Sequence, residues 1–207
     1  DCVPSPRQPK DSKPEPLPAR RLILAVGIVG NFETLGLEAA GVKVDRTHVV
    51  INQWGETGVA GLWAIGDLAG PPWLAHKAMH EGVIVAERIA GVKGVHPLNT
   101  SNVPGCTYCW PQVASVGMTE AKAKTTGRKL KIGRFPFIGN GKAIALGDAD
   151  GLVKTVFDAD TGELLGAHMI GAEVTELINS YTVAKTGELT DAELAQQLAD
   201  HRIEIAG

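Results

Sequence analysis

Three short runs of consecutive apolar residues divide the first half of the chain. They are Leu22–Val26, Val49–Ile51 and Leu62–Ile65, and each is followed directly by glycine or asparagine. An apolar run without polar alternation is typical of a strand that is buried on both faces of a parallel sheet. The pattern therefore predicts three buried strands in this half.

Between Leu74 and Ala90 the apolar positions recur with the 3.6-residue period of a helix. One face collects the small and apolar side chains of Ala75, Ala78, Met79, Gly82, Val83, Ala86 and Ala90, and the opposite face carries Lys77, Glu81, Glu87 and Arg88. We expect the small-residue face to be buried close against a sheet. Gly91 follows the helix and can adopt the left-handed conformation that ends one.

The second half predicts an antiparallel sheet. Strands are expected at Leu130–Pro136, Ala143–Leu146, Leu152–Asp158 and Leu164–Ile170, and the turn-forming segments 148–151 and 158–162 separate neighbours as in a meander. Two helices follow. One is expected over Val174–Thr186, and the next begins at Thr190, which has the capping-box spacing with Glu193.

These changes of pattern predict how the chain is divided. Six of the twelve prolines lie between Pro4 and Pro18, and proline fixes φ and removes a backbone donor. Residues 1–20 are therefore interpreted as a linker or disordered leader, or alternatively as a Pro-rich ligand for an aromatic groove. Residues 21–98 form one domain and residues 99–207 another. The fold class is α+β: an α/β segment followed by an antiparallel sheet with helices on one side.

Composition narrows the function classes. A chain of 207 residues that is 44% apolar can bury a sizeable core. Its 20 basic and 23 acidic side chains lack the strongly basic balance of a nucleic-acid-binding domain. The sequence has no apolar run long enough to cross a membrane. Three cysteines are too few for a disulfide scaffold and favour a reducing compartment.

The candidate chemistry begins at Gly66 and Asp67, directly after the run that ends at Ile65. Ligands of open α/β sheets bind at the carboxyl ends of strands, and a carboxylate there can accept hydrogen bonds from hydroxyl groups. The helix that opens at Leu74, Ala75 and His76 would offer free N–H groups and a positive dipole end to an electron-rich group. The alternative is that Asp67 only caps a turn and the helix only packs.

Residues 64–78, together with Glu81 and Gly82, resemble the second flavin-binding motif of the dihydrolipoyl dehydrogenase family of flavin–disulfide oxidoreductases. The motif reads Ala64-Ile65-Gly66-Asp67-Leu68-Ala69-Gly70-Pro71-Pro72-Trp73-Leu74-Ala75-His76-Lys77-Ala78. Segments 25–27 and 35–38 resemble the return of the chain from that family's nicotinamide domain. Segments 111–117, 119–120, 135–137, 150–154 and 165–171 resemble its interface domain. The resemblance runs from about Arg21 to His201.

The resemblance implies a role for each part of the chain. Residues 21–98 would be part of an FAD-binding domain, with a remnant of the NAD domain's last strand, and residues 99–207 a dimerisation domain. Gly66 and Asp67 would meet the flavin ribityl chain, with the carboxylate as acceptor. The helix start at Leu74, Ala75 and His76 would face the pyrimidine edge of the flavin, mainly through its backbone.

The intact parent enzyme would pass electrons from a dihydrolipoyl group through a cysteine pair and FAD to NAD. Its partners would be a second subunit, either another copy or a full-length one, and the lipoyl-bearing protein of a 2-oxoacid dehydrogenase complex. Its location would be the bacterial cytoplasm or the mitochondrial matrix.

Several parts of the family's machinery are not found in these residues. The sequence contains neither a Gly-x-Gly-x-x-Gly in the required context nor a cysteine pair five residues apart, and Cys106 and Cys109 are expected to be small buried residues. His201 falls where the family has its catalytic histidine, but no Pro-Thr follows it, and Ala206 stands where the orienting glutamate belongs. We therefore expect a fragment that does not turn over alone.

Two alternatives from other classes remain open. The chain could be a non-catalytic dimerisation or interaction module without cofactor. It could also hold zinc, since His76 and His80 stand at i and i+4 on one helix, and Cys106 and Cys109 have zinc-ligand spacing. The family interpretation includes no metal, nucleic acid or membrane.

Overall fold

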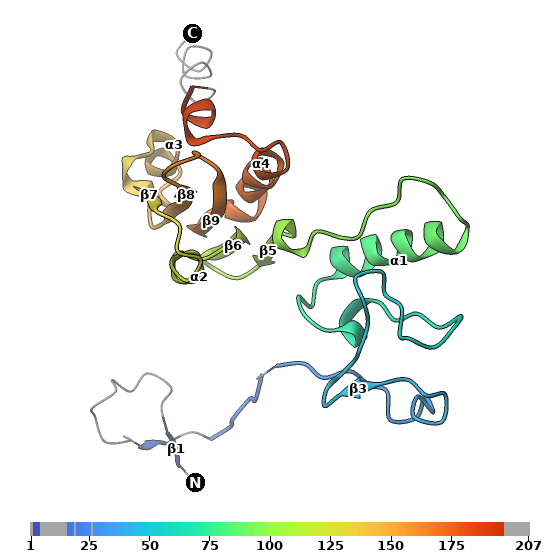
Figure 1. The fold of residues 1–207 in the computed structure, drawn as a ribbon. Coiled ribbons are helices and arrows are strands. Elements are labelled where there is room, and N and C mark those ends of the chain that lie inside the picture. Colours follow the sequence, from blue (N-terminus) through green and yellow to red (C-terminus); the bar gives the residue numbers. More distant parts are fainter. Residues whose placement is uncertain (1, 5–15, 19, 26, 197–207) are drawn as a thin grey trace.

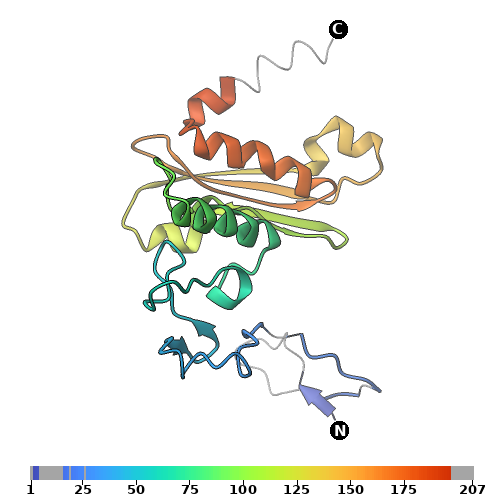
Figure 2. The same cartoon turned by 90° about the vertical axis from the view of Figure 1, so that its right-hand side faces the viewer.

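The computed structural model describes residues 2–4, 16–18, 20–25 and 27–196. Figures 1 and 2 show two units. The first unit, residues 20–98, consists of loops and one long helix, and the second unit, from residue 99 onward, is built on an antiparallel sheet. Within the predicted leader, β1 (Cys2–Pro4) pairs antiparallel with β2 (Pro16–Pro18). Both are edge strands, where proline is tolerated. His201 lies outside the described residues.

The three buried strands expected in the first unit do not form as predicted. Residues 22–25 are not a strand, and the Ile23 side chain is 89% exposed. Residues 62–65 contribute only an isolated bridge between Trp63 and Glu56. The run at 49–51 is reduced to β4 (His48–Val49), which pairs with β3 (Val44–Asp45). An apolar run becomes a strand only when a neighbouring segment pairs with its backbone. Among the described residues, these three runs have few or no such backbone partners.

The long helix is confirmed as α1 (Ala75–Ile89). Gly91 has φ of +69°, and the chain closes there in a Schellman motif, because the Gly91 amide donates to the Arg88 carbonyl and the Val92 amide to that of Glu87. No helix in the described part of the chain combines the length and apolar character that crossing a bilayer requires.

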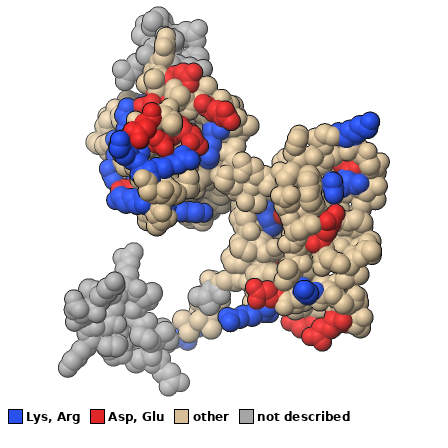
Figure 3. Space-filling view, viewed as in Figure 1, with Lys and Arg blue, Asp and Glu red and all other residues tan. Residues whose placement is uncertain are grey.

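The prediction of which face of α1 is buried was wrong. Met79 and Val83 are 71% and 56% exposed, whereas Lys77, assigned to the polar face, is 2% exposed. Figure 3 shows that the first unit presents a broad uncharged surface, while charged side chains gather on the second unit. Within the described residues α1 therefore packs through Lys77, Ala78 and Gly82, whereas most of the small-residue face is exposed.

The second unit is a five-stranded antiparallel sheet in the order β5-β6-β9-β8-β7. Its strands are β5 (Gly105–Thr107), β6 (Gln112–Gly117), β7 (Leu130–Pro136), β8 (Leu152–Asp158) and β9 (Leu164–Gly171). The predicted bounds of β7 and β8 are confirmed, and β9 is one residue longer than predicted. The unit also contains α2 (Glu120–Lys124) and α4 (Val174–Thr186), and α4 matches its predicted bounds. The α+β class is confirmed.

One predicted strand of this unit is a helix. Residues 143–146 belong largely to α3 (Gly141–Ala145), whose first turn is capped by the Asn140 side chain through hydrogen bonds from the amides of Lys142 and Ala143. A residue at the N-cap that satisfies free amides favours a helix over a strand. The capping box at the next helix start is confirmed, because the Glu193 carboxylate accepts from the Thr190 amide at 2.7 Å.

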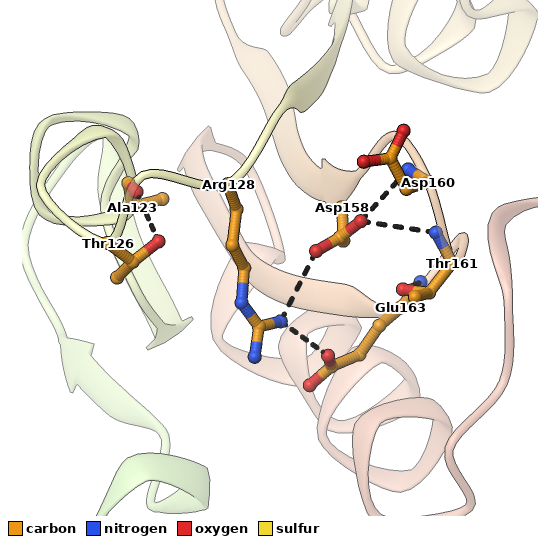
Figure 4. Close-up of polar contacts among 7 residues, drawn as sticks. All are labelled: Ala123, Thr126, Arg128, Asp158, Asp160, Thr161 and Glu163. Carbon is orange, nitrogen blue, oxygen red and sulfur yellow. Dashed lines mark hydrogen bonds and ion pairs between the residues drawn. The ribbon is translucent and has the colours of Figure 1, made fainter.

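The main core lies between the sheet and α4. Ala114, Val116, Ala167 and Met169 from the strands cluster with Val174 and Ile178 of α4, and all are 3% exposed or less. At the other end of the sheet, the Asp158 carboxylate orders the turn between β8 and β9, since it accepts hydrogen bonds from the amides of Asp160 and Thr161 (Figure 4). Arg128 bridges Asp158 and Glu163 over the same turn.

A carboxylate at the start of α2 makes the stability of this unit depend on pH. Glu120 contacts Lys124 at 2.7 Å and Lys154 at 2.7 Å, and these ammonium groups lower the pKa of Glu120 to about 2, from 4.5. A carboxyl whose folded pKa is depressed stabilises the fold above its unfolded pKa and loses that contribution as the pH falls through the folded value.

We expect the urea midpoint of the chain to fall as the pH drops from 4.5 toward 2. The variant Glu120→Gln has no carboxyl to protonate at this position, so its midpoint is expected to fall less over the same range. Parallel pH dependences for the two proteins would contradict the assignment.

Candidate functional site

Asp67 lies in a one-turn 3₁₀ helix, η1 (Gly66–Ala69), and not at the tip of a regular strand. The prediction of a regular strand end is corrected because residues 62–65 pair with residues 55–57 only through an isolated bridge and a few backbone hydrogen bonds. Gly66 has φ of +72°, and a Cβ built there would lie 3.2 Å from the Ala78 Cβ, so η1 approaches α1 closely. Gly66 is buried and Asp67 is exposed. The turn therefore rests on α1 and presents its carboxylate outward.

The amino end of α1 has no side-chain cap. Its N-cap residue is Leu74, which has extended backbone and makes no side-chain cap hydrogen bond. The first amide to find an intrahelical partner is that of Ala78, which donates to the Leu74 carbonyl at 3.2 Å. The backbone N–H groups at the helix start are therefore the donors that such an end leaves for a ligand.

The His76 side chain points away from this role. Its Nε2 donates to the Pro104 carbonyl at 2.9 Å, which ties α1 to the entry of the second unit. The side chain is thus engaged with Pro104, and a contribution of His76 at the helix start through its backbone stays a prediction.

The loop between η1 and α1 is fixed by an aromatic pair. Trp73 stacks on His48 with ring centroids 5.9 Å apart, and the Trp73 indole N–H donates to Nε2 of His48 at 3.1 Å. Nδ1 of the same ring lies 2.7 Å from the Thr47 hydroxyl. The sequence analysis did not identify this pair, because neither residue belongs to a periodic pattern.

A second feature that the sequence analysis missed is an ion pair beneath η1. The Lys77 ammonium lies 3.1 Å from Oε1 of Glu81 and donates to the carbonyls of Gly66 and Gly70, at 3.2 and 2.8 Å. Oε2 of Glu81 accepts from the Gly66 amide at 2.7 Å. The helical period placed both side chains on a solvated face. Gly66 and Gly70, on either side of Asp67, are the sequence signal that could have predicted this ion pair, because the backbone groups of these glycines need hydrogen-bond partners.

The two cysteines of the second unit are both free thiols. Cys106 is half-buried, and burial, followed by the charge of Glu176, raises the pKa of its thiol, which disfavours the reactive thiolate. Cys109 is exposed, so the expectation that it is buried was wrong. The described residues form no group of three or more potential metal ligands, so the zinc alternative gains no support from the geometry.

The arrangement combines an exposed hydrogen-bond acceptor, Asp67 on η1, with backbone donors at the uncapped start of α1, against which η1 packs. The Asp67 carboxylate can accept from hydroxyl groups, and the amides of Ala75 and His76 can donate to an electron-rich edge. Both elements are attached to α1. A ligand that carries a polyol next to a ring able to hold negative charge fits this donor and acceptor set.

Comparisons with known proteins agree with both units. Residues 103–201 match the family described as pyridine nucleotide-disulphide oxidoreductase, dimerisation domain, and residues 6–82 match the one described as pyridine nucleotide-disulphide oxidoreductase. The chain belongs to the pyridine nucleotide–disulphide oxidoreductase family.

Among curated relatives, the chain is 60% identical over 191 residues to a dihydrolipoyl dehydrogenase of Rhizobium etli, covering 92% of this chain and 40% of that protein. It is 61% identical over 179 residues to one of Zymomonas mobilis, covering 86% and 38%. The chain thus spans about 40% of the length of these relatives.

Solved structures agree as well. LpdA of Mycobacterium tuberculosis matches with a TM-score of 0.74 and 28% identity, over 81% of this chain and 37% of that one. The HOCl-induced flavoprotein disulfide reductase RclA of Escherichia coli matches with a TM-score of 0.73 and 26% identity, over 80% and 38%.

Proposed function

We propose that these residues are part of a dihydrolipoyl dehydrogenase and supply one side of its flavin site together with its dimerisation domain. The observation that carries the proposal is the joining of Asp67, on η1, to the uncapped start of α1, in a chain about 60% identical to proteins of that name. The intact enzyme would oxidise a dihydrolipoyl group and reduce NAD.

Each site residue has a defined task in this proposal. Asp67 accepts a hydrogen bond from the ribityl chain of FAD, and buried Gly66 lets the turn lie against α1. Leu74 leaves the helix start uncapped, and the amides of Ala75 and His76 stabilise negative charge at the pyrimidine edge. FAD, when bound, supplies two-electron transfer between thiols and the nicotinamide.

The remaining parts of the reaction lie outside the described residues or outside this sequence. No Cys-x-x-x-x-Cys occurs in the 207 residues, so by themselves they do not supply the thiol pair. His201 keeps its assignment as a candidate proton-exchanging group, without the glutamate that orients it in the family. The second unit pairs with another subunit, and a lipoyl-bearing protein of a 2-oxoacid dehydrogenase complex is the proposed electron donor.

The test is to express the complete reading frame that encodes these residues and to measure bound flavin and the dihydrolipoamide-dependent reduction of NAD. We expect a yellow dimer with activity. A folded, colourless dimer without activity would contradict the proposal and favour the non-catalytic module.

A further inference from the structure

The Lys77–Glu81 ion pair is largely withdrawn from solvent, since Lys77 is the buried residue of α1 and Glu81 is half-buried beside it. The Lys77 residue is 2% exposed and the Glu81 side chain 16%. Burying two charges carries a desolvation penalty that their attraction alone often fails to offset. The structural role of this pair therefore depends on the other hydrogen bonds that the two side chains make.

Those contacts all go to the backbone of one short segment. The three protons of the Lys77 ammonium match three acceptors: the carbonyls of Gly66 and Gly70, and the Glu81 carboxylate. Glu81 uses its other oxygen for the Gly66 amide. With its donors occupied, Lys77 has no proton left for a ligand, so the pair acts on the turn and not on a substrate.

The segment that is held is the one that carries Asp67. Gly66 and Gly70 bracket η1, and both have positive φ, +72° and +98°. At the end of η1, the Gly70 amide closes the last turn by donating to the Asp67 carbonyl at 3.2 Å. Because η1 is only four residues long, most of its backbone groups lie at or next to its ends, and its shape depends on contacts from outside the segment.

From this geometry we propose that Lys77 and Glu81 are positioning residues for the flavin: together they clamp both ends of η1 onto α1 and so fix the Asp67 carboxylate relative to the amides at the helix start. The proposal rests on the proposed function, because it gives Asp67 its ligand. Asp67 touches the cofactor, whereas Lys77 and Glu81 act through it.

The test uses the FAD-loaded protein from the complete reading frame and removes both charges together, in the double variant Lys77→Met/Glu81→Leu. Replacing a buried pair jointly leaves no unpaired charge, so the fold is expected to persist. The matched control is Arg88→Met/Glu56→Leu, which removes another ion pair from α1, at 3.4 Å, that does not touch η1. FAD affinity and the hydrogen exchange of the Gly66 and Gly70 amides are measured in each.

We expect the Lys77→Met/Glu81→Leu variant to bind FAD on the order of 10-fold more weakly, the equivalent of one misplaced hydrogen bond, and to exchange the Gly66 and Gly70 amides faster. The control is expected to change neither. When the same pair is removed from an Asp67→Ala protein, FAD affinity is expected to fall by less than about 2-fold further, because coupled residues are not additive.

Two results separate the failure of this inference from that of the site. If Asp67→Ala weakens FAD binding but removing the pair does not, or if the two losses multiply in full, the positioning role is wrong and the site stands. If Asp67→Ala leaves FAD affinity unchanged, the proposed flavin site itself is overturned.

Discussion

Replacing Ile178 with alanine is expected to lower the free energy of unfolding by about 2–5 kcal/mol. Ile178 is 1% exposed and lies where α4 meets Val116 and Met169 of the sheet. Removing its side-chain carbons loses their transfer free energy and leaves a cavity that the closely packed strands cannot fill. Urea denaturation of the chain at one fixed protein concentration measures the change.

The matched control is Val183→Ala on the same helix. Val183 is 63% exposed, so truncating it is expected to change the free energy of unfolding by no more than about 0.5 kcal/mol. Similar losses for the two variants would mean that α4 does not present its Ile178 face to the sheet.

Replacing Asp67 with alanine in the complete protein is expected to weaken FAD binding by about 10–100-fold, the effect of losing one hydrogen bond to a charged acceptor. The carboxylate is exposed on η1 and makes its contribution to the ligand, not to the core. Titration of the apoprotein with FAD gives the affinity. The denaturation midpoint of the apoprotein is expected to stay close to that of the parent.

Asp45→Ala is the control for charge. Asp45 is an exposed carboxylate in β3 of the same unit, and its removal is expected to leave FAD affinity unchanged. Equal weakening in both variants would point to a general electrostatic effect and away from a contact at Asp67.

The second unit could be predicted from sequence because its signals are local. The turn residues 158–162 separate β8 from β9, and β8 pairs with both β7 and β9 within this chain. The helix α4 was correct to the residue for the same reason. The error at residues 143–146 arose because a short apolar run carries no period, and the capping by Asn140 decided for a helix.

The first unit was harder because its elements depend on partners. Residues 22–25 and 62–65 have the composition of buried strands, but composition does not supply a hydrogen-bonded neighbour. The same dependence explains why the buried face of α1 was predicted incorrectly. The small residues Ala75 and Ala86 are exposed, and the helix instead buries Lys77. A charged residue such as Lys77 is expected on the solvent-exposed face of an amphipathic helix.

The roles of the candidate site residues stay predictions, and the contacts that hold those residues in place were not predicted from the sequence. The motif identified Asp67 and the start of α1, both of which the structure places on connected elements. The sequence did not predict the Lys77–Glu81 pair or the stacking of Trp73 on His48. Both depend on contacts with backbone groups or rings from other parts of the chain, and a pattern of apolar and polar residues does not show such contacts.

The most direct measurement of the central claim is an experimental structure of the complete protein with FAD bound. We expect a ribityl hydroxyl within about 2.5–3.0 Å of an Asp67 carboxylate oxygen, with the amides of Ala75 and His76 at the pyrimidine edge of the flavin. A flavin bound elsewhere, with Asp67 still facing solvent, would contradict the account.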